Sequence, residues 1–339
     1  MNPWQTKNGP LWLLAPMEDV TDTVFRRVVR EASGDAPVVF YTEFTSTDGL
    51  NHEKARDKVI HRLRYTESER PLVAQIWGKN PEHYRQVARD ILELGFDGVD
   101  INMGCPVKKI VKQGSCSALI KTPTLASEII RAVQEGVAGQ IPVSVKTRIG
   151  FDRVRTEEWC SHLLGHDLAA LIVHGRTTRE LSKVPCHWDE IAKVPALRDN
   201  LAPQTLVIGN GDVTSRAHGE KLIMRTNVDG IMVGRGIFKN PWFFHPEYAL
   251  ENDGTVSRRG RLVPPSERLS LFISHLRLWH ETYPPGTNHN YQALRKFCKV
   301  YLQGFAGAGE LRQRFMETKR VEEGLTLLTN TQKVFSKKS

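Results

Sequence analysis

Residues 72–102 read LVAQIWGKNPEHYRQVARDILELGFDGVDIN and hold one complete repeat of the pattern that decides the fold. The apolar runs at 72–77 and 98–102 are typical of strands that are buried on both faces. The segment 81–94 between them is amphipathic and predicts a helix, with Pro81 in the first turn, where a proline is tolerated. The repeat therefore predicts a strand, a helix and a second strand in succession.

The same alternation runs through the first 255 residues, where further helices are predicted at 21–31 and 124–135. Six more candidate strands bring the total to eight, and they lie at 11–17, 38–44, 142–148, 170–174, 205–209 and 229–234. Eight strand–helix repeats in about 250 residues have the size and order of an α/β protein of the (β/α)8 TIM barrel type. A doubly wound parallel sheet uses a similar alternation and is the second possibility.

A second, smaller domain is predicted after Tyr248, where the alternation stops. The polar stretch that follows contains Gly and Pro and is typical of a linker. Apolar residues then recur at helical spacing, with Ser266 as a plausible N-cap. We predict a catalytic barrel at 1–250, a linker at 251–265, a small all-helical domain at 266–330 and a basic tail at 331–339.

The charge of the chain is concentrated at one end. Of the 339 residues 40% are hydrophobic and 25% charged, which excludes a disordered or disulfide-stapled protein. Residues 255–339 hold fifteen Lys or Arg, six Glu and no Asp, so this segment alone accounts for the net charge of +9. Such a segment is either a solvated basic face or a module that binds a polyanion.

Several features indicate where the protein works. No apolar run approaches the roughly 18 residues of a membrane span, and residues 1–10 lack the profile of a secretory signal. The five cysteines are irregularly spaced, which argues against a disulfide framework or a structural zinc site. We expect a cytoplasmic protein without a bound metal, a membrane or a stable protein partner, and a monomer.

Glycine-bearing turns follow the last two predicted strands, in the strings GNGD (209–212) and GRG (234–236). Glycines let backbone N–H groups approach an anion closely, and the loops after strands seven and eight are the usual phosphate site of such barrels. Tight turns explain many short Gly-x-Gly strings. Two of them at this pair of strand ends nevertheless favour a phosphate-bearing ligand.

Three further residues at strand ends have side chains that could take part in binding or catalysis. Lys146 lies in an apolar strand, and a cofactor with negative charge would explain a lysine there. His174 is either a core histidine or a group that faces a ligand. Cys105 stands between a glycine and a proline just past a strand, where a thiol can act as a nucleophile or a proton donor.

Six motifs resemble those of the tRNA-dihydrouridine synthases, which are FMN-dependent TIM-barrel enzymes. They are APMEDVTD (15–22), DINMGCPVKK (100–109), VSVKTRIG (143–150), VHGRT (173–177), GNGD (209–212) and MVGRGIFKNPW (232–242). The string LRKFCKVYLQGF (294–305) is similar to part of the family's helical RNA-binding domain. The resemblance extends from about residue 11 to residue 325.

The resemblance implies reduction of the C5–C6 double bond of particular uridines in tRNA, with bound FMN and with NADPH as reductant. Cys105 would be the catalytic proton donor to C5, while reduced FMN delivers hydride to C6. This role requires the thiol form, so a low pKa of Cys105 would be a handicap. The implied FMN-binding residues are Pro16, Met17, Glu18, Gln75, Lys146, His174, Asn210, Gly211, Asp212, Gly234 and Arg235. The implied substrate-binding residues are Asn102, Arg148 and Arg176.

The chain departs from the family pattern at three places. Glu18-Asp19 follow the methionine where the family often has Ala-Gly or Glu-Gly. Cys116 stands where the family usually has glycine or alanine, and residues 180–187 lack the Tyr-x-Gly often found there. Two other functions are compatible with parts of the sequence. An FMN-dependent barrel reductase of a small molecule would explain the phosphate loops but not the basic module. A non-catalytic tRNA-binding protein would explain the basic module but not Cys105 and Lys146.

Overall fold

The computed structural model describes residues 2–5, 9–284 and 290–336. The chain forms two compact units. The barrel unit comprises the chain before Val24 together with Pro37–Val213 and His218–Gly234. The C-terminal unit comprises Val24–Ala36, Thr214–Ala217 and the chain from Arg235 onward.

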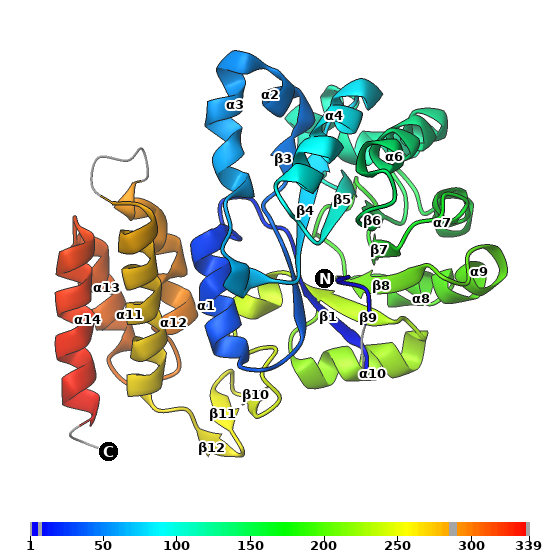
Figure 1. Ribbon diagram of the computed structural model, residues 1–339. Coiled ribbons are helices and arrows are strands. Elements are labelled where there is room, and N and C mark those ends of the chain that lie inside the picture. Colours follow the sequence, from blue (N-terminus) through cyan, green and yellow to red (C-terminus); the bar gives the residue numbers. More distant parts are fainter. Residues whose placement is uncertain (1, 6–8, 285–289, 337–339) are drawn as a thin grey trace. The chain divides into compact units, whose positions relative to one another are not determined.

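Eight parallel strands close into a barrel, at the centre of the barrel unit in Figure 1. In spatial order they are β2 (Val38–Tyr41), β1 (Leu11–Leu14), β9 (Gly230–Val233), β8 (Leu206–Asn210), β7 (Ala170–His174), β6 (Val143–Arg148), β5 (Gly98–Met103) and β4 (Leu72–Trp77). The pairing of β2 with β4 completes the ring, and the two-residue β3 (Thr45–Ser46) extends the edge of β4. The closed ring confirms the predicted (β/α)8 barrel and excludes an open doubly wound sheet.

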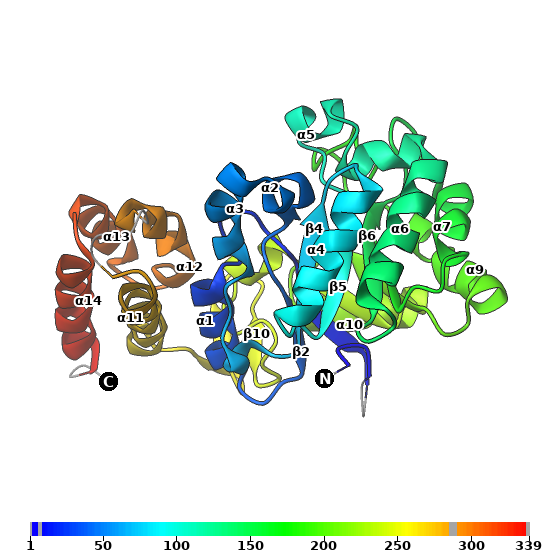
Figure 2. The ribbon, with the colours of Figure 1, turned by 45° about the horizontal axis from the view of Figure 1, so that its top comes forward.

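Helices surround these strands, and the longer ones, such as α4 and α6, bury an apolar face. They are α2 (Thr47–Asn51), α3 (Glu53–Val59), α4 (Pro81–Glu93), α5 (Lys108–Lys112), α6 (Pro123–Val137), α7 (Thr156–Leu164), α8 (Trp188–Ile191), α9 (Val194–Leu201) and α10 (Arg216–Thr226). Helix α4 illustrates the local logic, since the Asn80 side chain caps its first turn and Tyr84, Val87 and Ile91 are buried. Figure 2 shows α4 and α6 side by side outside the strands.

The C-terminal unit contains helices from both ends of the chain. Its helices are α1 (Thr23–Ser33), α11 (Pro265–Thr282), α12 (Cys298–Tyr301), α13 (Ala308–Glu317) and α14 (Val321–Ser336). In α1, which begins one residue before this unit, the ring of Phe25 lies 5.0 Å from Phe297 and 6.0 Å from His275. The helix after the first barrel strand therefore shares a core with helices some 250 residues later in the chain.

The predicted linker and tail differ from the structure. The segment around 251–265 takes part in an antiparallel sheet of β10 (Tyr248–Leu250), β11 (Val256–Arg258) and β12 (Arg261–Leu262). Arg259 and Gly260 both have positive φ, the geometry of a tight two-residue hairpin turn. The C-terminal unit therefore also contains a small sheet, while the described part of 266–330, where the all-helical domain was predicted, contains helices and no strand. Residues 331–336 of the predicted tail continue α14, and residues 337–339 lie outside the described residues.

Candidate active site at the carboxyl ends of the strands

The strand register points a column of polar side chains into the barrel. The interior is defined by a cluster of buried apolar residues that includes Ala170, Ile172 and Ile208. In-register neighbours on adjacent strands face the same side. Ser144 and Lys146 are in register with Ala170 and Ile172 and therefore face the interior. Their own partners on β5, Asp100 and Asn102, do so too, and Arg148 continues the same face of β6.

The lower layer of this column is a hydrogen-bonded polar network. Asp100 is fully buried and accepts hydrogen bonds from Gln75 Nε2 at 2.7 Å and from Ser144 Oγ at 2.6 Å. Burial raises the pKa of Asp100 to about 6, although these hydrogen bonds act in the opposite direction. Gln75 Oε1 in turn accepts from Asn102 Nδ2 at 3.0 Å. The network fixes the orientation of both carboxamides.

Asn102 connects this network to the loop that carries Cys105. Its Oδ1 accepts hydrogen bonds from the backbone N–H groups of Gly104 at 3.0 Å and Cys105 at 2.9 Å. The same carboxamide therefore contacts Gln75 below and the cysteine loop above. The Cys105 side chain is half-buried. A hydrogen bond with the thiol of Cys116 lowers the pKa of Cys105 to about 7.

Lys146 occupies the next layer and is partly buried. Its Nζ donates to Asn210 Oδ1 at 3.1 Å, and Asn210 Nδ2 donates to the carbonyl of Met232 at 2.8 Å. Desolvation and the nearby Arg148 lower the pKa of Lys146 to about 8. The nearby Asp100 acts in the opposite direction, and the hydrogen bond of the ammonium group goes to a neutral amide. An anionic ligand beside Lys146 would stabilise its charge further.

Arg148 is hydrogen-bonded to backbone carbonyls of two loops at the carboxyl ends of the strands. Its Nε donates to Gly104 O at 2.7 Å, and its Nη1 donates to the carbonyls of Thr177 at 3.1 Å and Leu181 at 3.2 Å. Only 6% of Arg148 is exposed, and burial lowers its pKa to about 10. Arg148 therefore joins the cysteine loop to the segment after β7.

A second cluster lies where β7 and β8 end. Arg176 is ion-paired with Asp212, and its Nη1 lies 3.3 Å from His174 Nε2. The backbone N–H of Cys186 also donates to Asp212, at 3.0 Å. Gly211 has φ +130°, and a Cβ built there would lie 2.5 Å from the Cys186 sulfur. Only glycine fits this turn, which keeps the backbone close to His174.

The first and last barrel loops come together beside this cluster. A Cβ built on Gly234 would lie 3.9 Å from the sulfur of Met17, so these two residues are near neighbours. Pro16 and Met17 are half-buried, and the exposed Glu18 pairs with Arg62 at 3.0 Å. Arg235 follows Gly234 directly and begins a 3-10 helix, with an exposed side chain.

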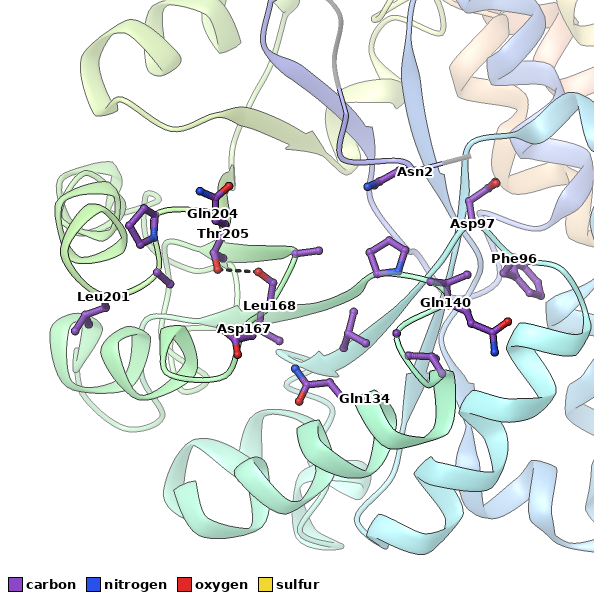
Figure 3. Close-up of a pocket in the computed structure, with 18 residues that line it drawn as sticks. Asn2, Phe96, Asp97, Gln134, Gln140, Asp167, Leu168, Leu201, Gln204 and Thr205 are labelled. Carbon is purple, nitrogen blue, oxygen red and sulfur yellow. Dashed lines mark hydrogen bonds between the residues drawn. The ribbon is translucent and has the colours of Figure 1, made fainter.

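A hollow of about 870 Å³ lies at the opposite end of the barrel. Its lining includes Asp97, Leu168, Gln204 and Thr205, which precede strands rather than follow them (Figure 3). Thr205 Oγ1 donates to the carbonyl of Leu168 at 2.7 Å. Active sites of such barrels form at the carboxyl ends of the strands, so this hollow is not the candidate site.

Comparison with known proteins now identifies the family. Residues 13–338 match the family described as "Dihydrouridine synthase (Dus)". The chain belongs to this family. It is 44% identical to "Probable tRNA-dihydrouridine synthase 2" of Bacillus subtilis over 335 residues, with 98% of each chain covered. It is 43% identical to "Probable tRNA-dihydrouridine synthase" of Staphylococcus epidermidis over 328 residues, covering 96% of this chain and 95% of that one.

Two solved structures share the barrel at low sequence identity. Histamine dehydrogenase from Rhizobium sp. 4-9 has a TM-score of 0.53 and 12% identity, and the match covers 71% of this chain and 47% of that one. A 2-naphthoyl-CoA reductase complex has a TM-score of 0.50 and 11% identity, with coverages of 70% and 50%. This chain thus spans about half of each of these proteins. At such identities the likeness shows the fold alone.

The family assignment confirms the resemblance predicted from the six motifs and makes the chain a member of an oxidoreductase family. The individual roles of the predicted site residues stay predictions. In the described part of the chain, no helix has the length and apolar character of a membrane span. Nor do three or more His, Cys, Asp or Glu side chains gather there as a metal site.

Sequence reasoning left two members of the interior column without a role. Asp100 and Ser144 lie two residues before Asn102 and Lys146 on their strands, so they share the same inward face. The signal was therefore present in the period-two spacing. Glu43 was also missed, and its Oε1 accepts from the backbone N–H of Asp19 at 2.6 Å. Glu43 and Asp19 follow different strands and are 24 residues apart, so no local sequence pattern indicates their contact.

Proposed function

We propose that this dihydrouridine synthase family member reduces the C5–C6 double bond of uridines in tRNA, with FMN as bound cofactor and NADPH as reductant. The observation that carries the proposal is the position of Cys105. Its loop is bound by Asn102 and Arg148 at the top of an inward-facing polar column that also contains Lys146. That the substrate is tRNA is inferred from the relatives named tRNA-dihydrouridine synthase.

The residues at the strand ends have the chemistry that FMN requires. Gly211, Asp212, Gly234 and Arg235 would bind the phosphate, since glycine turns expose backbone N–H groups and Arg235 adds positive charge. Asn210 would also contact the phosphate. Lys146 would lie along the ring system, together with Pro16, Met17, Glu18, Gln75 and His174. When bound and reduced, FMN supplies the hydride for C6 of the uracil.

Cys105 donates the proton to C5. Asn102 and Arg148 orient the base, and Arg176 positions the substrate or the cofactor phosphate. Because the pKa of Cys105 is lowered to about 7, both its thiol and its thiolate form are populated near neutral pH. The thiol form needed for proton donation is therefore present, but its share decreases as the pH rises. A uridine stacked in folded tRNA reaches this site only when it is flipped out.

The C-terminal unit binds the tRNA backbone through its positive charge. Residues 255–339 carry the whole net excess of +9. If two or more phosphates are contacted, affinity for tRNA should fall roughly tenfold or more between about 50 and 200 mM salt.

Replacement of the exposed cations Lys299 and Arg314 by Ala should reduce both the affinity and this salt slope. The matched control Lys54→Ala, exposed on the barrel unit, should change neither. Salt-independent binding would contradict this role.

The central experiment compares the wild type with Cys105→Ala. Both proteins should show the visible absorption of oxidised flavin, and anaerobic NADPH should bleach it in both. Unmodified tRNA should restore the absorption in the wild type, while Cys105→Ala should react at least about 100-fold more slowly. Equal rates would disprove the proton-donor role. If added tRNA did not restore the flavin absorption of the wild type, the small-molecule reductase would be favoured. If the protein bound no flavin, the non-catalytic tRNA-binding protein would be favoured.

A further inference from the structure

Cys116 is an unusual residue in an unusual conformation. It begins the 3-10 helix Cys116–Lys121, is fully buried and has φ +55°, a left-handed value that favours glycine. A cysteine is therefore strained at this position, where glycine would not be. The backbone conformation therefore gives no reason for a cysteine at this position.

The segment that carries Cys116 lies against the one cysteine with a proposed role in the reaction. The thiol of Cys116 is near enough to that of Cys105 to lower its pKa. The neighbouring Ser117 holds the two chain segments together, because its N–H donates to the Cys105 carbonyl at 3.4 Å and its Oγ donates to the same oxygen at 2.9 Å. Both the side chains and the backbones of these segments are thus adjacent.

The two cysteines differ in the way that a reactive and a resolving thiol differ. Cys105 is half-buried, and its hydrogen bond with Cys116 lowers its pKa to about 7. Burial raises the pKa of Cys116 well above its usual value. Burial likewise raises the pKa of each of the other three, Cys160, Cys186 and Cys298, to about 12. Thiolate character and exposure determine where oxidants react, so Cys105 reacts first.

We propose that Cys105 and Cys116 form a reversible disulfide when the protein is exposed to hydrogen peroxide. The Cys105 thiolate attacks one peroxide oxygen, the O–O bond breaks, and the departing hydroxide takes up a proton to become water. The sulfur of Cys116 then attacks the Cys105 sulfenic acid, the S–S bond forms, and the oxygen leaves as water with the Cys116 proton. Two thiols are thereby oxidised, one peroxide is reduced to two waters, and a dithiol reductant reverses the change.

The consequence for activity rests on the proposed function. The disulfide would remove the thiol that protonates C5, so tRNA reduction should stop until the bond is reduced. It would also protect Cys105 from irreversible oxidation, because a sulfenic acid with no neighbouring thiol proceeds to sulfinic acid. Disulfide formation itself does not depend on the proposed function and is measured separately.

The test treats the purified full-length protein with hydrogen peroxide, then maps its cysteines by peptide mass spectrometry before and after dithiothreitol. The matched variant is Cys116→Ser, which keeps a hydrogen-bond donor near Cys105 but cannot form the disulfide. In the wild type we expect a Cys105–Cys116 linkage, with activity reduced to that of Cys105→Ala and regained with dithiothreitol. In Cys116→Ser we expect Cys105 sulfinic acid and a loss of activity that dithiothreitol does not reverse.

Each outcome bears on one proposal. Sulfinic acid at Cys105 in the wild type without the linkage would overturn the disulfide, as would a linkage of Cys105 to another cysteine. A Cys105–Cys116 linkage with undiminished tRNA reduction would support the disulfide and instead overturn the proton-donor role of Cys105. Peptide mapping of the wild type decides the question even if Cys116→Ser fails to fold.

Discussion

At the amino ends of the barrel strands, polar side chains are bound to nearby structural groups, whereas at the carboxyl ends they face one another inside the barrel. Asp97 accepts from the backbone N–H of Leu72 at 2.8 Å and pairs with Arg70 at 3.0 Å. Asp100 lies only three residues later, yet its partners are side chains of the inward column, and burial raises its pKa. The polar groups at the amino end thus stabilise the barrel, whereas the inward column contains groups with shifted pKa values.

This difference shows that the size of a hollow is a poor guide to a site. The hollow of about 870 Å³ is at the amino end, where Thr205 of its lining is hydrogen-bonded to a backbone carbonyl. The inward polar column, which runs from Asp100 up to the carboxyl ends of the strands, instead combines pKa values of about 6 for Asp100, 7 for Cys105 and 8 for Lys146. Several neighbouring groups with pKa values shifted toward 7 are typical of active sites, because proton transfer near pH 7 requires such values.

The largest predicted effect contrasts Lys146→Met with Gln204→Ala, one at each end. Methionine keeps most of the side-chain volume but removes the charge, so the single-turnover rate of tRNA reduction should fall about 100-fold or more. Gln204 is an exposed residue of the amino-end hollow, and its replacement should leave the rate unchanged within about twofold. Stopped-flow flavin absorption measures both. Similar losses at the two ends would refute the assignment of the site to the carboxyl end.

The sequence predicted the barrel because strands buried on both faces are continuous apolar runs with clear ends. The strand predicted at 98–102 is observed at Gly98–Met103, for example. The partner of α1 was not predictable in the same way. Amphipathic spacing shows that a helix has an apolar face but not what covers it, and Phe25 packs on Phe297 from the far end of the chain. Long-range packing of this kind has no local signal.

The candidate site was predictable to a similar degree. Motifs and strand ends led to Cys105, Lys146 and Asn102, and the structure connects Asn102 directly to the Cys105 loop. The contact between Cys105 and Cys116 was not predictable, because it depends on how the loop after β5 folds back on itself. The low pKa of Cys105 follows from that contact, so it too appears only in the structure.

The second predicted effect compares the two buried aspartates. The folded-state pKa of Asp100 is raised from 3.8 to about 6, so its contribution to stability is fully present below pH 3.8 and is lost as the pH rises through about 6. At pH 8 the loss is on the order of 3 kcal/mol. Asp100→Asn should remove this pH dependence and be more stable than the wild type at pH 8, since Ser144 can accept from the new amide.

Asp97→Asn should do the opposite and lower the free energy of unfolding by about 1–3 kcal/mol at pH 8, because Asp97 is paired with Arg70. Urea unfolding of the three proteins at several pH values between about 4 and 8 measures both effects. A wild-type pH profile that persists unchanged in Asp100→Asn would show that another group causes it.

The smallest predicted effect concerns the pH profile of the reaction. Because Cys105 must be a thiol to donate a proton and its pKa is about 7, the single-turnover rate should decrease as the pH rises through about 7. The hydrogen bond with Cys116 is the main cause of the low pKa. Cys116→Ala removes it, so the decrease should move to higher pH, and at pH 8 the variant should retain up to about tenfold more of its maximal rate.

Cys116→Ser is the control for this shift, since its hydroxyl can still donate to the Cys105 thiolate and should keep the decrease near pH 7. If Cys116→Ala left the decrease in place, the titrating group would have to be another member of the carboxyl-end cluster, with Lys146 and its pKa of about 8 the next to test. If both variants moved it equally, the effect would come from the thiol of Cys116 and not from hydrogen bonding. A shift in Cys116→Ala alone would assign the pH dependence of turnover to the contact between the two cysteines.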